Sequence, residues 1–468
     1  MESTALYDRI IGAGTAALDG TLKTITSGAY SAGDTLSGVI QTAAGVTGAF
    51  SLLDTQITPT LSWRPAVNGN NLDLVASRVY NNDRLRAYLN PNQKSVAAMM
   101  QSAASSAGGD LDAVMSEIDA MTTYGGVAGA YSEISPEKLS GMAALSLANA
   151  QIELQNLQKE MMELRRQSDN SVLLTYNGED WGRFNTAGQQ SEGYDFFVSG
   201  GGTFADQDAT QNQPGYTYNG GGITAGLDYR ISDTTIGGYY GGYTRTGSNI
   251  GGTGGKINVN SISCGVFGIH TAGDFYLDIA FSTAWNFYDA TRNIRFGTVD
   301  RKAKSDTWGR QFNSLAGAGY EFHYGNLVTG PTSTLQYSKA WIDGFAEKDA
   351  DSLNLRISRQ QTDSLQTGLG WGVEYELEIG KKKILPQLFA SYQHEFLNDA
   401  RLIEAGLAQG SDTFETETDG PTRNFSLIGA GLSAQLTDKI AANLNYRTKV
   451  GQRKYSAHTL EGSVRVSF

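Results

Sequence analysis

The stretch TLEGSVRVSF, residues 459–468, ends the chain with an almost unbroken alternation of residue types. One face collects small, apolar and aromatic residues: Leu460, Gly462, Val464, Val466 and Phe468. The other face collects polar and charged residues: Thr459, Glu461, Ser463, Arg465 and Ser467. Because successive side chains of a strand point to opposite faces, this pattern is typical of a barrel with lipid outside and water inside. It predicts a strand of an outer-membrane β-barrel.

Composition agrees with a membrane crossing made by strands. The 468 residues include 57 Gly and 23 Tyr, with 40% hydrophobic residues, and no apolar run approaches the roughly 20 residues of a membrane-spanning helix. A net charge of -12 argues against a nucleic-acid partner, and Lys381-Lys382-Lys383 is the only compact basic run. A single cysteine, Cys264, excludes an internal disulfide and a metal site built from several thiolates.

Residues 1–80 hold short apolar runs broken by turn dipeptides such as Asp19-Gly20. Strands of so few residues do not close a sandwich core comfortably. This zone therefore predicts a short β-solenoid stub.

Residues 81–170 change to the period of a helix. Asn90-Pro91 predicts a helix over 93–107, and Asp110 predicts the cap of a second helix through Met121. Ser135-Pro136 predicts the start of a third helix over 136–166, on the order of 45 Å long at 1.5 Å per residue. The three zones give the predicted domains 1–80, 81–170 and 171–468.

The second half of the third helix is polar around a narrow Leu/Met stripe. It is either a surface or coiled-coil helix, or a pore helix threaded through a polar lumen with partners on nearly every side, and we favour the latter. The predicted pore-helix site consists of Gln151, Gln155, Gln158, Lys159, Glu163 and Arg166.

The third zone consists of long alternating strands. Phe275, Leu277, Ile279, Phe281, Trp285 and Phe287 would share the lipid-facing side of one of them. We predict twelve strands, at 194–206, 216–230, 233–246, 256–271, 274–292, 306–324, 327–345, 362–379, 384–398, 423–437, 439–449 and 454–468. An even number lets an antiparallel barrel close with both ends on one side. The fold class is thus mainly β: a twelve-stranded antiparallel transmembrane β-barrel with a helix in the lumen, preceded by helices and the solenoid stub.

Motifs in this order resemble the β-domain of type V autotransporters of Gram-negative bacteria. They are WIDGFAE at 341–347, DSL at 363–365, HEF at 394–396, LIGAGLS at 427–433 and GSVRVSF at 462–468. Upstream, DRII at 8–11, GTAALDGTL at 14–22, PTL at 59–61 and NLDL at 71–74 are similar to the last turns of a β-helical passenger. SPE at 135–137 resembles the opening of the linker helix of that family.

The resemblance implies an outer-membrane pore that carries its own N-terminal passenger to the cell surface and then holds the linker helix as a plug. It implies outer-membrane lipid, the barrel-assembly machinery, periplasmic chaperones and the passenger as partners, and a Met1 internal to a longer precursor. The implied assembly signal is Gly462, Val464, Val466 and Phe468, although Val466 stands where an aromatic residue is common. No self-cleavage at an Asn-Asn pair is expected, because Asn70-Asn71 and Asn81-Asn82 both precede the pore helix.

Two other functions stay open: a porin or adhesin-type barrel, and a hydrolase within a barrel. Gly12-Ala13-Gly14 imitates a dinucleotide fingerprint but is followed by a turn rather than a helix. Gly33-Asp34-Thr35-Leu36 has threonine where a Gly-Asp-Ser-Leu esterase carries its nucleophile. The histidines His270, His323, His394 and His458 are scattered without metal-ligand spacing. We therefore expect no catalytic residue, no metal site and no cofactor in this chain.

Overall fold

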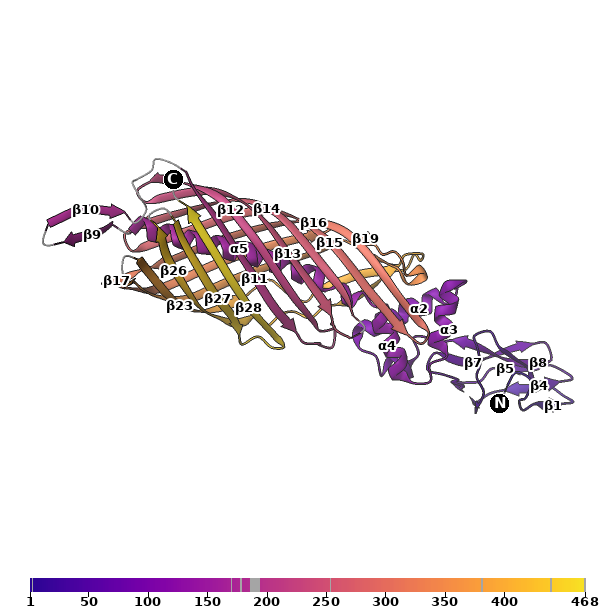
Figure 1. Ribbon diagram of the computed structural model, residues 1–468. Coiled ribbons are helices and arrows are strands. Elements are labelled where there is room, and N and C mark those ends of the chain that lie inside the picture. The colour runs from indigo at the N-terminus through magenta and orange to yellow at the C-terminus, as the bar shows by residue number, and fades with distance from the viewer. Residues whose placement is uncertain are drawn as a thin grey trace.

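The computed structural model describes residues 1, 3–169, 171–176, 179–185, 194–252, 254–379, 382–437 and 440–466. Solenoid, helices and barrel follow one another along one elongated molecule, and a long helix runs inside the barrel (Figure 1). No helix in these described ranges is long and apolar enough to cross a membrane.

The first eight strands form two solenoid coils and a capping hairpin. Their bounds are β1 (Ile10–Gly12), β2 (Ala16–Leu18), β3 (Thr21–Lys23), β4 (Thr35–Thr42), β5 (Val46–Gly48), β6 (Leu52–Asp54), β7 (Leu61–Asn68) and β8 (Asn71–Arg78). Each strand of the first coil pairs in parallel with its counterpart in the second, β1 with β4, β2 with β5 and β3 with β6. The antiparallel hairpin β7–β8 then pairs with β4 and ends the stack. The prediction of a solenoid stub is confirmed.

Helices follow the hairpin. They are α1 (Asp83–Arg86), α2 (Pro91–Ala103), α3 (Asp110–Asp119), α4 (Tyr124–Ile134), the 3₁₀ turn η1 (Pro136–Leu139) and α5 (Gly141–Asp169). At the start of α2, Asn90 and Gln93 cap one another reciprocally and Pro91 takes the first turn, as expected from the sequence.

Three details of the helices differ from the sequence-based prediction. Helix α4 lies between Met121 and Ser135, where the sequence analysis predicts no helix, and burial of Val127, Tyr131 and Ile134 holds it. Asp110 does not cap α3, since its carboxylate receives two hydrogen bonds of 2.7 Å from Arg301. Ser135-Pro136 opens the turn η1, and the long helix begins at Gly141 rather than at 136.

Twelve strands close into an antiparallel barrel, as predicted. They are β11 (Tyr194–Gln207), β12 (Tyr216–Ser232), β13 (Thr235–Ile250), β14 (Gly255–Ala272), β15 (Phe275–Phe296), β16 (Val299–Tyr320), β18 (Leu327–Ile342), β21 (Gln360–Tyr375), β23 (Lys382–Glu395), β26 (Asn424–Thr437), β27 (Ile440–Val450) and β28 (Tyr455–Val466). Two short pieces, β17 (Phe322–Tyr324) and β22 (Leu377–Ile379), prolong β16 and β21. The barrel closes where β28 pairs with β11 and β16 pairs with β18.

The hairpin of β9 (Ser171–Tyr176) and β10 (Glu179–Asn185) connects α5 to the barrel. These two strands pair with one another and project from one end of the barrel (Figure 1). The first strand of the barrel wall therefore begins at Tyr194.

The opposite end of the barrel carries longer connections and the helices α2 to α4. A small sheet stands there, made of β19 (Phe345–Ala346), β20 (Leu355–Ile357), β24 (Leu402–Leu407) and β25 (Phe414–Glu417), with the 3₁₀ turn η2 (Asp351–Leu353) beside it. One hydrophobic core joins Met100 of α2, Ile134 of α4, Leu355 of β20 and Ile294 of β15. The helices are thus packed onto the mouth of the barrel.

The strands alternate as the sequence predicts. Along β15, residues from Phe275 to Phe287 on one face are exposed on the outside, while Tyr276, Asp278 and Tyr288 on the other face are buried inside. Several inward rings lie over glycines of a neighbouring strand: a Cβ added to Gly265 would come within 2.6 Å of the Tyr240 ring. Such glycines let large inward side chains lie flat against the wall.

Candidate functional site

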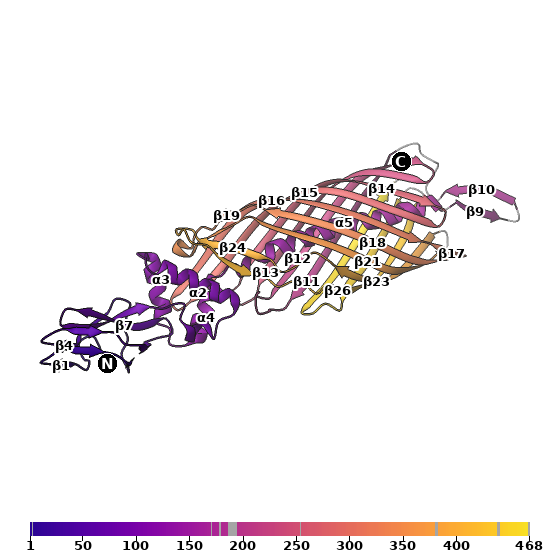
Figure 2. The ribbon, with the colours of Figure 1, turned by 180° about the vertical axis from the view of Figure 1, so that it is seen from behind.

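The lumen and its helix form the candidate site. Helix α5 lies inside the barrel and contacts β11 to β14 most extensively (Figure 2). We call the six strands β11 to β16 the near wall, and β18, β21, β23, β26, β27 and β28 the far wall. The two walls hold the helix in different ways.

The near wall meets α5 through an apolar core. The helix contributes Leu154, Leu157, Met161 and Leu164, and the wall contributes Phe197, Ile236, Tyr240, Phe267, Ile269, Ala280 and Leu315. All four helix residues are at most 2% exposed. The sequence-based expectation of polar partners did not include this apolar core, where burial of apolar surface holds the helix against the near wall.

Glycines on the near wall allow α5 to lie close to the strands. A Cβ added to Gly220 would lie 3.1 Å from Cδ1 of Ile152, and one added to Gly222 would lie 3.2 Å from Cγ2 of the same side chain. A Cβ at Gly201 would lie 2.9 Å from Oδ1 of Asn156. Larger residues at these three positions would push the helix away from the wall.

A buried ion cluster crosses the line where the barrel closes. Arg465 of β28 hydrogen-bonds Glu160 of α5 and donates two bonds of 2.7 Å to Asp228 of β12. Asp195 of β11 lies 3.5 Å from the same guanidinium. One cation therefore links the last strand, the first two strands and the helix. Removing it would leave buried carboxylates uncompensated.

A second buried cation fixes the C-terminal end of the helix. Arg165 pairs with Asp278 of β15, and its guanidinium lies 3.7 Å from the centre of the Tyr276 ring. Oε1 of Glu321 is 3.7 Å from its Nε. Towards the mouth the contacts of the helix are between neutral groups. Asn149 donates a hydrogen bond of 2.7 Å to the Ser261 hydroxyl, and the Ser146 hydroxyl lies 2.7 Å from the Tyr288 hydroxyl.

Strands β26 and β27 of the far wall are reached by single polar side chains. Glu163 accepts hydrogen bonds of 2.8 Å from Ser433 and from Asn443. Lys449 donates a hydrogen bond of 3.0 Å to the side chain of Gln151, and Lys159 donates one of 3.5 Å to the Asn443 carbonyl. These contacts join the helix to strands that it does not pack against closely.

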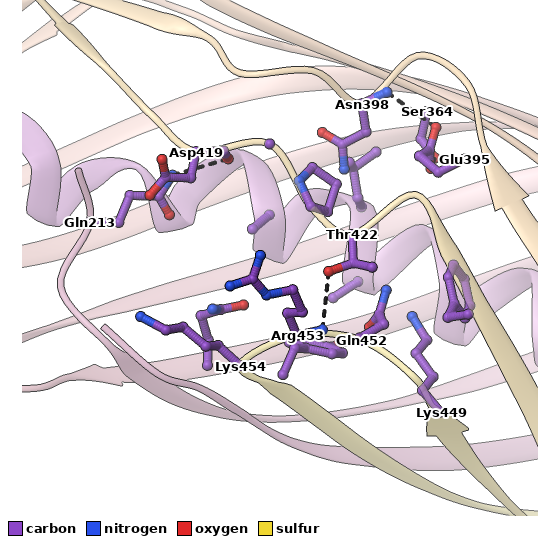
Figure 3. A pocket seen from close by; sticks show the side chains of 18 of the residues that line it. Gln213, Ser364, Glu395, Asn398, Asp419, Thr422, Lys449, Gln452, Arg453 and Lys454 are labelled. Atoms are coloured by element: carbon purple, nitrogen blue, oxygen red, sulfur yellow. Dashed lines mark hydrogen bonds between the residues drawn. The ribbon is translucent and has the colours of Figure 1, made fainter. Parts of the chain in front are cut away.

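A cavity of about 770 Å³ remains between the first turns of α5 and the far wall, at the mouth. Figure 3 shows polar side chains gathered around it, among them Glu395, Asp419, Lys449 and Arg453. Nζ of Lys449 lies 5.2 Å from the centre of the Phe425 ring. Side chains of both positive and negative charge line the cavity. Within the described residues no group of three or more His, Cys, Asp and Glu could hold a metal ion. The polar lining of the cavity suits hydrated chain or solute.

The mouth is fastened by a buried arginine. Arg292 of β15 donates two hydrogen bonds, of 2.9 and 2.6 Å, to the carboxylate of Glu347. It donates two more, each of 2.9 Å, to the Glu133 carbonyl of α4 and to the Leu353 carbonyl. Glu137 of η1 is also buried, and this burial raises the pKa of its carboxyl group to about 7. Hydrogen bonds from Asn92 and Ser135 act in the opposite direction and lower the pKa. The linker helices are therefore locked to the loops of the barrel.

The predicted site residues are placed as follows. Gln151, Lys159 and Glu163 contact the far wall as described above, while Gln155 is buried and its Oε1 has no hydrogen-bond partner among the described residues. Gln158 is half-buried, and of Arg166 only the backbone lies in the described part of α5. Their roles in a plug stay predictions.

The predicted assembly residues lie on β28. Val464 is exposed on the outer surface, Gly462 is half-buried and Val466 pairs with Phe196. Phe468 lies outside the described residues. Their role as an assembly signal is untested.

Sequence reasoning missed Glu160, Arg165 and Arg465 as site residues. The signal for Arg465 was available, because a charge on the inner face of a closing strand requires a buried partner.

The barrel matches a known protein family, and the chain has relatives among characterised proteins. Residues 196–447 match the family model described as the autotransporter beta-domain. Esterase EstA of Pseudomonas aeruginosa is 25% identical over 280 residues, which cover 58% of this chain and 42% of that protein. Outer membrane protein A of Rickettsia conorii is 23% identical over 280 residues, 56% of this chain and 14% of that protein. The chain thus spans less than half the length of these relatives.

Solved structures with a similar barrel include two translocators. The translocator domain of NalP from Neisseria meningitidis is 17% identical, with a TM-score of 0.47, covering 68% of this chain and 99% of that one. The transport unit of AIDA-I from Escherichia coli is 13% identical, with a TM-score of 0.41, covering 67% and 98%. The family model spans more than half of the chain and coincides with the closed barrel. The chain therefore belongs to the autotransporter family, and its barrel is an outer-membrane translocator.

Proposed function

We propose that this barrel exports its own N-terminal region to the cell surface and is afterwards plugged by α5. In this proposal residues 1–80 are the end of a β-helical passenger, 81–170 are the linker and the following residues carry the pore. The observation that carries it is the apolar core between α5 and the near wall, because a helix buried on one side is held in the pore after passage.

The order of elements supports this direction of passage. The solenoid and helices lie at the end of the barrel that has the long connections, and α5 leads from them to the first strand through the lumen (Figure 1). A chain that entered from the other end would leave its N-terminal residues outside the cell.

A topology experiment tests this proposal. A cleavable signal peptide and an epitope tag are fused to Met1, and intact cells are treated with external protease. Loss of the tag while the outer membrane stays sealed is the expected result. A tag protected until the membrane is opened would instead favour a porin-type barrel with helices in the periplasm.

We propose that the partners are outer-membrane lipid, the passenger itself, periplasmic chaperones and the barrel-assembly machinery, the last two acting on β28. Support comes from the outward Val464 and Gly462 on the final strand and from membership in the family. Crosslinking from position 464 during assembly, compared with position 444 on β27, tests the role of the final strand.

We propose no catalytic role for this chain. Two relatives are named Esterase EstA and Lipase 1, which makes a hydrolase the second candidate. Thr35 stands in the stretch Gly33-Asp34-Thr35-Leu36 that imitates a Gly-Asp-Ser-Leu motif, and its hydroxyl donates a hydrogen bond of 3.2 Å to the carbonyl of Gly33. Purified chain is expected not to hydrolyse p-nitrophenyl esters, and hydrolysis that Thr35→Ala abolishes would contradict this.

A further inference from the structure

The outer surface of the barrel has an apolar band that ends sharply towards the mouth. Along β15 the exposed residues from Phe275 to Phe287 are followed by Asp289. On the next three wall strands the corresponding first charges are Arg310 of β16, Lys339 of β18 and Asp363 of β21. These charges mark the level at which hydrocarbon gives way to lipid headgroups.

Arg310 stands at this boundary among tryptophans. In the strand register it lies directly opposite Trp285 of β15 on one side and Trp341 of β18 on the other. Its guanidinium also lies 5.3 Å from the centre of the Trp308 ring. Tryptophans favour the headgroup level of a bilayer, and an arginine over the face of one of them is attracted to its ring.

The charge of Arg310 is not balanced by the protein. Among the described residues no side chain forms a hydrogen bond or ion pair with it. Two acids on neighbouring wall elements are engaged elsewhere, Asp363 with Lys339 at 3.1 Å and Asp343 with Arg359 at 3.5 Å. A guanidinium held beside apolar surface is stabilised by an anion that can accept two of its N–H groups, and a phosphate fits that geometry.

We propose that Arg310, flanked by Trp285, Trp308 and Trp341, binds the phosphate of a lipid headgroup in the outer leaflet. The acyl chains of that lipid would lie along the apolar band below, and its sugar or glycerol portion would contact the tryptophan rings. The partner is a phosphorylated membrane lipid rather than free phosphate, because the site faces the bilayer and adjoins the hydrocarbon band.

The chain contains a matched control. Arg245 of β13 is also exposed on the outer face near the same boundary, and the structure describes no side-chain partner for it. Its register partners are Gly221 and Asn260, so it has no flanking tryptophan. A general attraction of cations to an anionic surface would act on both arginines, whereas a built site would involve Arg310 alone.

The test measures retention of lipid by the folded, purified chain in detergent. Bis-phosphorylated lipid A is added, bound lipid is counted by native mass spectrometry, and each variant is first checked for the heat-modifiable migration of a folded barrel. Arg310→Gln is expected to weaken binding about tenfold, the equivalent of one charge-assisted contact, whereas Arg245→Gln leaves it unchanged. Arg310→Lys keeps part of the binding and shows that the barrel tolerates substitution there.

Two further arms identify the chemistry. Dephosphorylated lipid A is expected to bind as weakly to the unsubstituted chain as lipid A binds to Arg310→Gln. Millimolar inorganic phosphate is expected not to compete. Equal losses in Arg310→Gln and Arg245→Gln, undiminished binding of dephosphorylated lipid, or displacement by free phosphate would each overturn the proposal.

Discussion

The near wall and the far wall of the lumen face the same helix and bind it by different physics. The near wall buries Leu157 and Met161 against inward apolar side chains and admits Ile152 over glycines. The far wall sends single polar groups such as Ser433 and Asn443 to Glu163, and near the mouth it leaves a cavity of about 770 Å³. The difference shows that α5 is held mainly from one side. Burial on the near wall fixes its position, and hydrogen bonds tie it to the far wall across a lumen that it does not fill.

The largest effect should come from breaking the near-wall contact. The double substitution Leu157→Pro with Met161→Pro introduces two helix-breaking residues, each costing about 3 kcal/mol, and removes two fully buried side chains. We expect cells to become permeable to large antibiotics and the purified pore to conduct in planar bilayers. Leu157→Met with Met161→Leu, which conserves volume, should leave both readouts unchanged. A sealed pore in the proline variant would show that α5 is not the barrier.

The next effect concerns the ion cluster that joins the walls. Arg465→Met leaves Glu160 and Asp228 buried without their cation, which should cost about 3–5 kcal/mol. The temperature at which the barrel loses its heat-modifiable migration should fall accordingly. Combining Arg465→Met with Glu160→Gln and Asp228→Asn should restore most of the loss.

A far-wall cation provides the comparison for that cluster. Lys449 donates to the neutral Gln151, so Lys449→Met should cost no more than about 1.5 kcal/mol. Equal losses from Arg465→Met and Lys449→Met would remove the distinction between the ion cluster that joins the two walls and a single contact with a neutral amide.

The sequence predicts the barrel far better than the lumen. Alternation identifies all twelve wall strands, because each must present an apolar face to lipid and a polar face to water, a constraint visible in every strand. The packing of α5 depends on which inward positions carry Phe197, Ile236 and Phe267, and these interrupt a polar face without any local signal of their partner. The two walls therefore could not be distinguished before the helix was placed.

The helices at the mouth illustrate a second limit of structure prediction from the sequence. Helix α4 forms from a glycine-rich segment because Arg292 donates hydrogen bonds to its C-terminal carbonyls and the barrel loops bury Tyr131 and Ile134. Residues more than a hundred positions away thus decide its structure. Local propensity alone favours a loop there.

The pH dependence of stability tests the mouth of the barrel independently of the two walls. Burial raises the pKa of Glu137 to about 7 from its usual 4.5, so the folded mouth binds the proton more tightly than the unfolded chain. The stability from this group is present below about pH 4.5 and is lost as the pH rises through 7. Hydrogen exchange of α2 and α4 should therefore indicate a mouth about 2 kcal/mol less stable at pH 8 than at pH 5. Glu137→Gln should abolish the dependence, and a dependence that survives in this variant would assign it to another group.

The smallest effect gives the most direct comparison of the walls. Gly222 and Gly372 both lie in wall strands, on the near and the far wall respectively, with no left-handed backbone at either position. A Cβ at Gly222 would meet Oγ1 of Thr244 at 2.7 Å and Cγ2 of Ile152 at 3.2 Å, whereas a Cβ at Gly372 meets nothing within 4 Å. The gain in backbone order on replacing glycine is similar for both, so it cancels in the comparison.

Gly222→Ala should therefore lower the stability of the barrel by about 1 kcal/mol relative to Gly372→Ala, as overpacking does in a filled core. Melting of the two variants under identical conditions measures this difference. Because α5 can relieve the clash by moving towards the cavity, Gly222→Ala should also raise the single-channel conductance slightly, while Gly372→Ala should not. Identical conductance would mean that the helix does not rest on the near wall at Ile152. The melting difference also contains the contacts of the new Cβ with Thr244 and Tyr243 inside the wall, so the conductance decides this point.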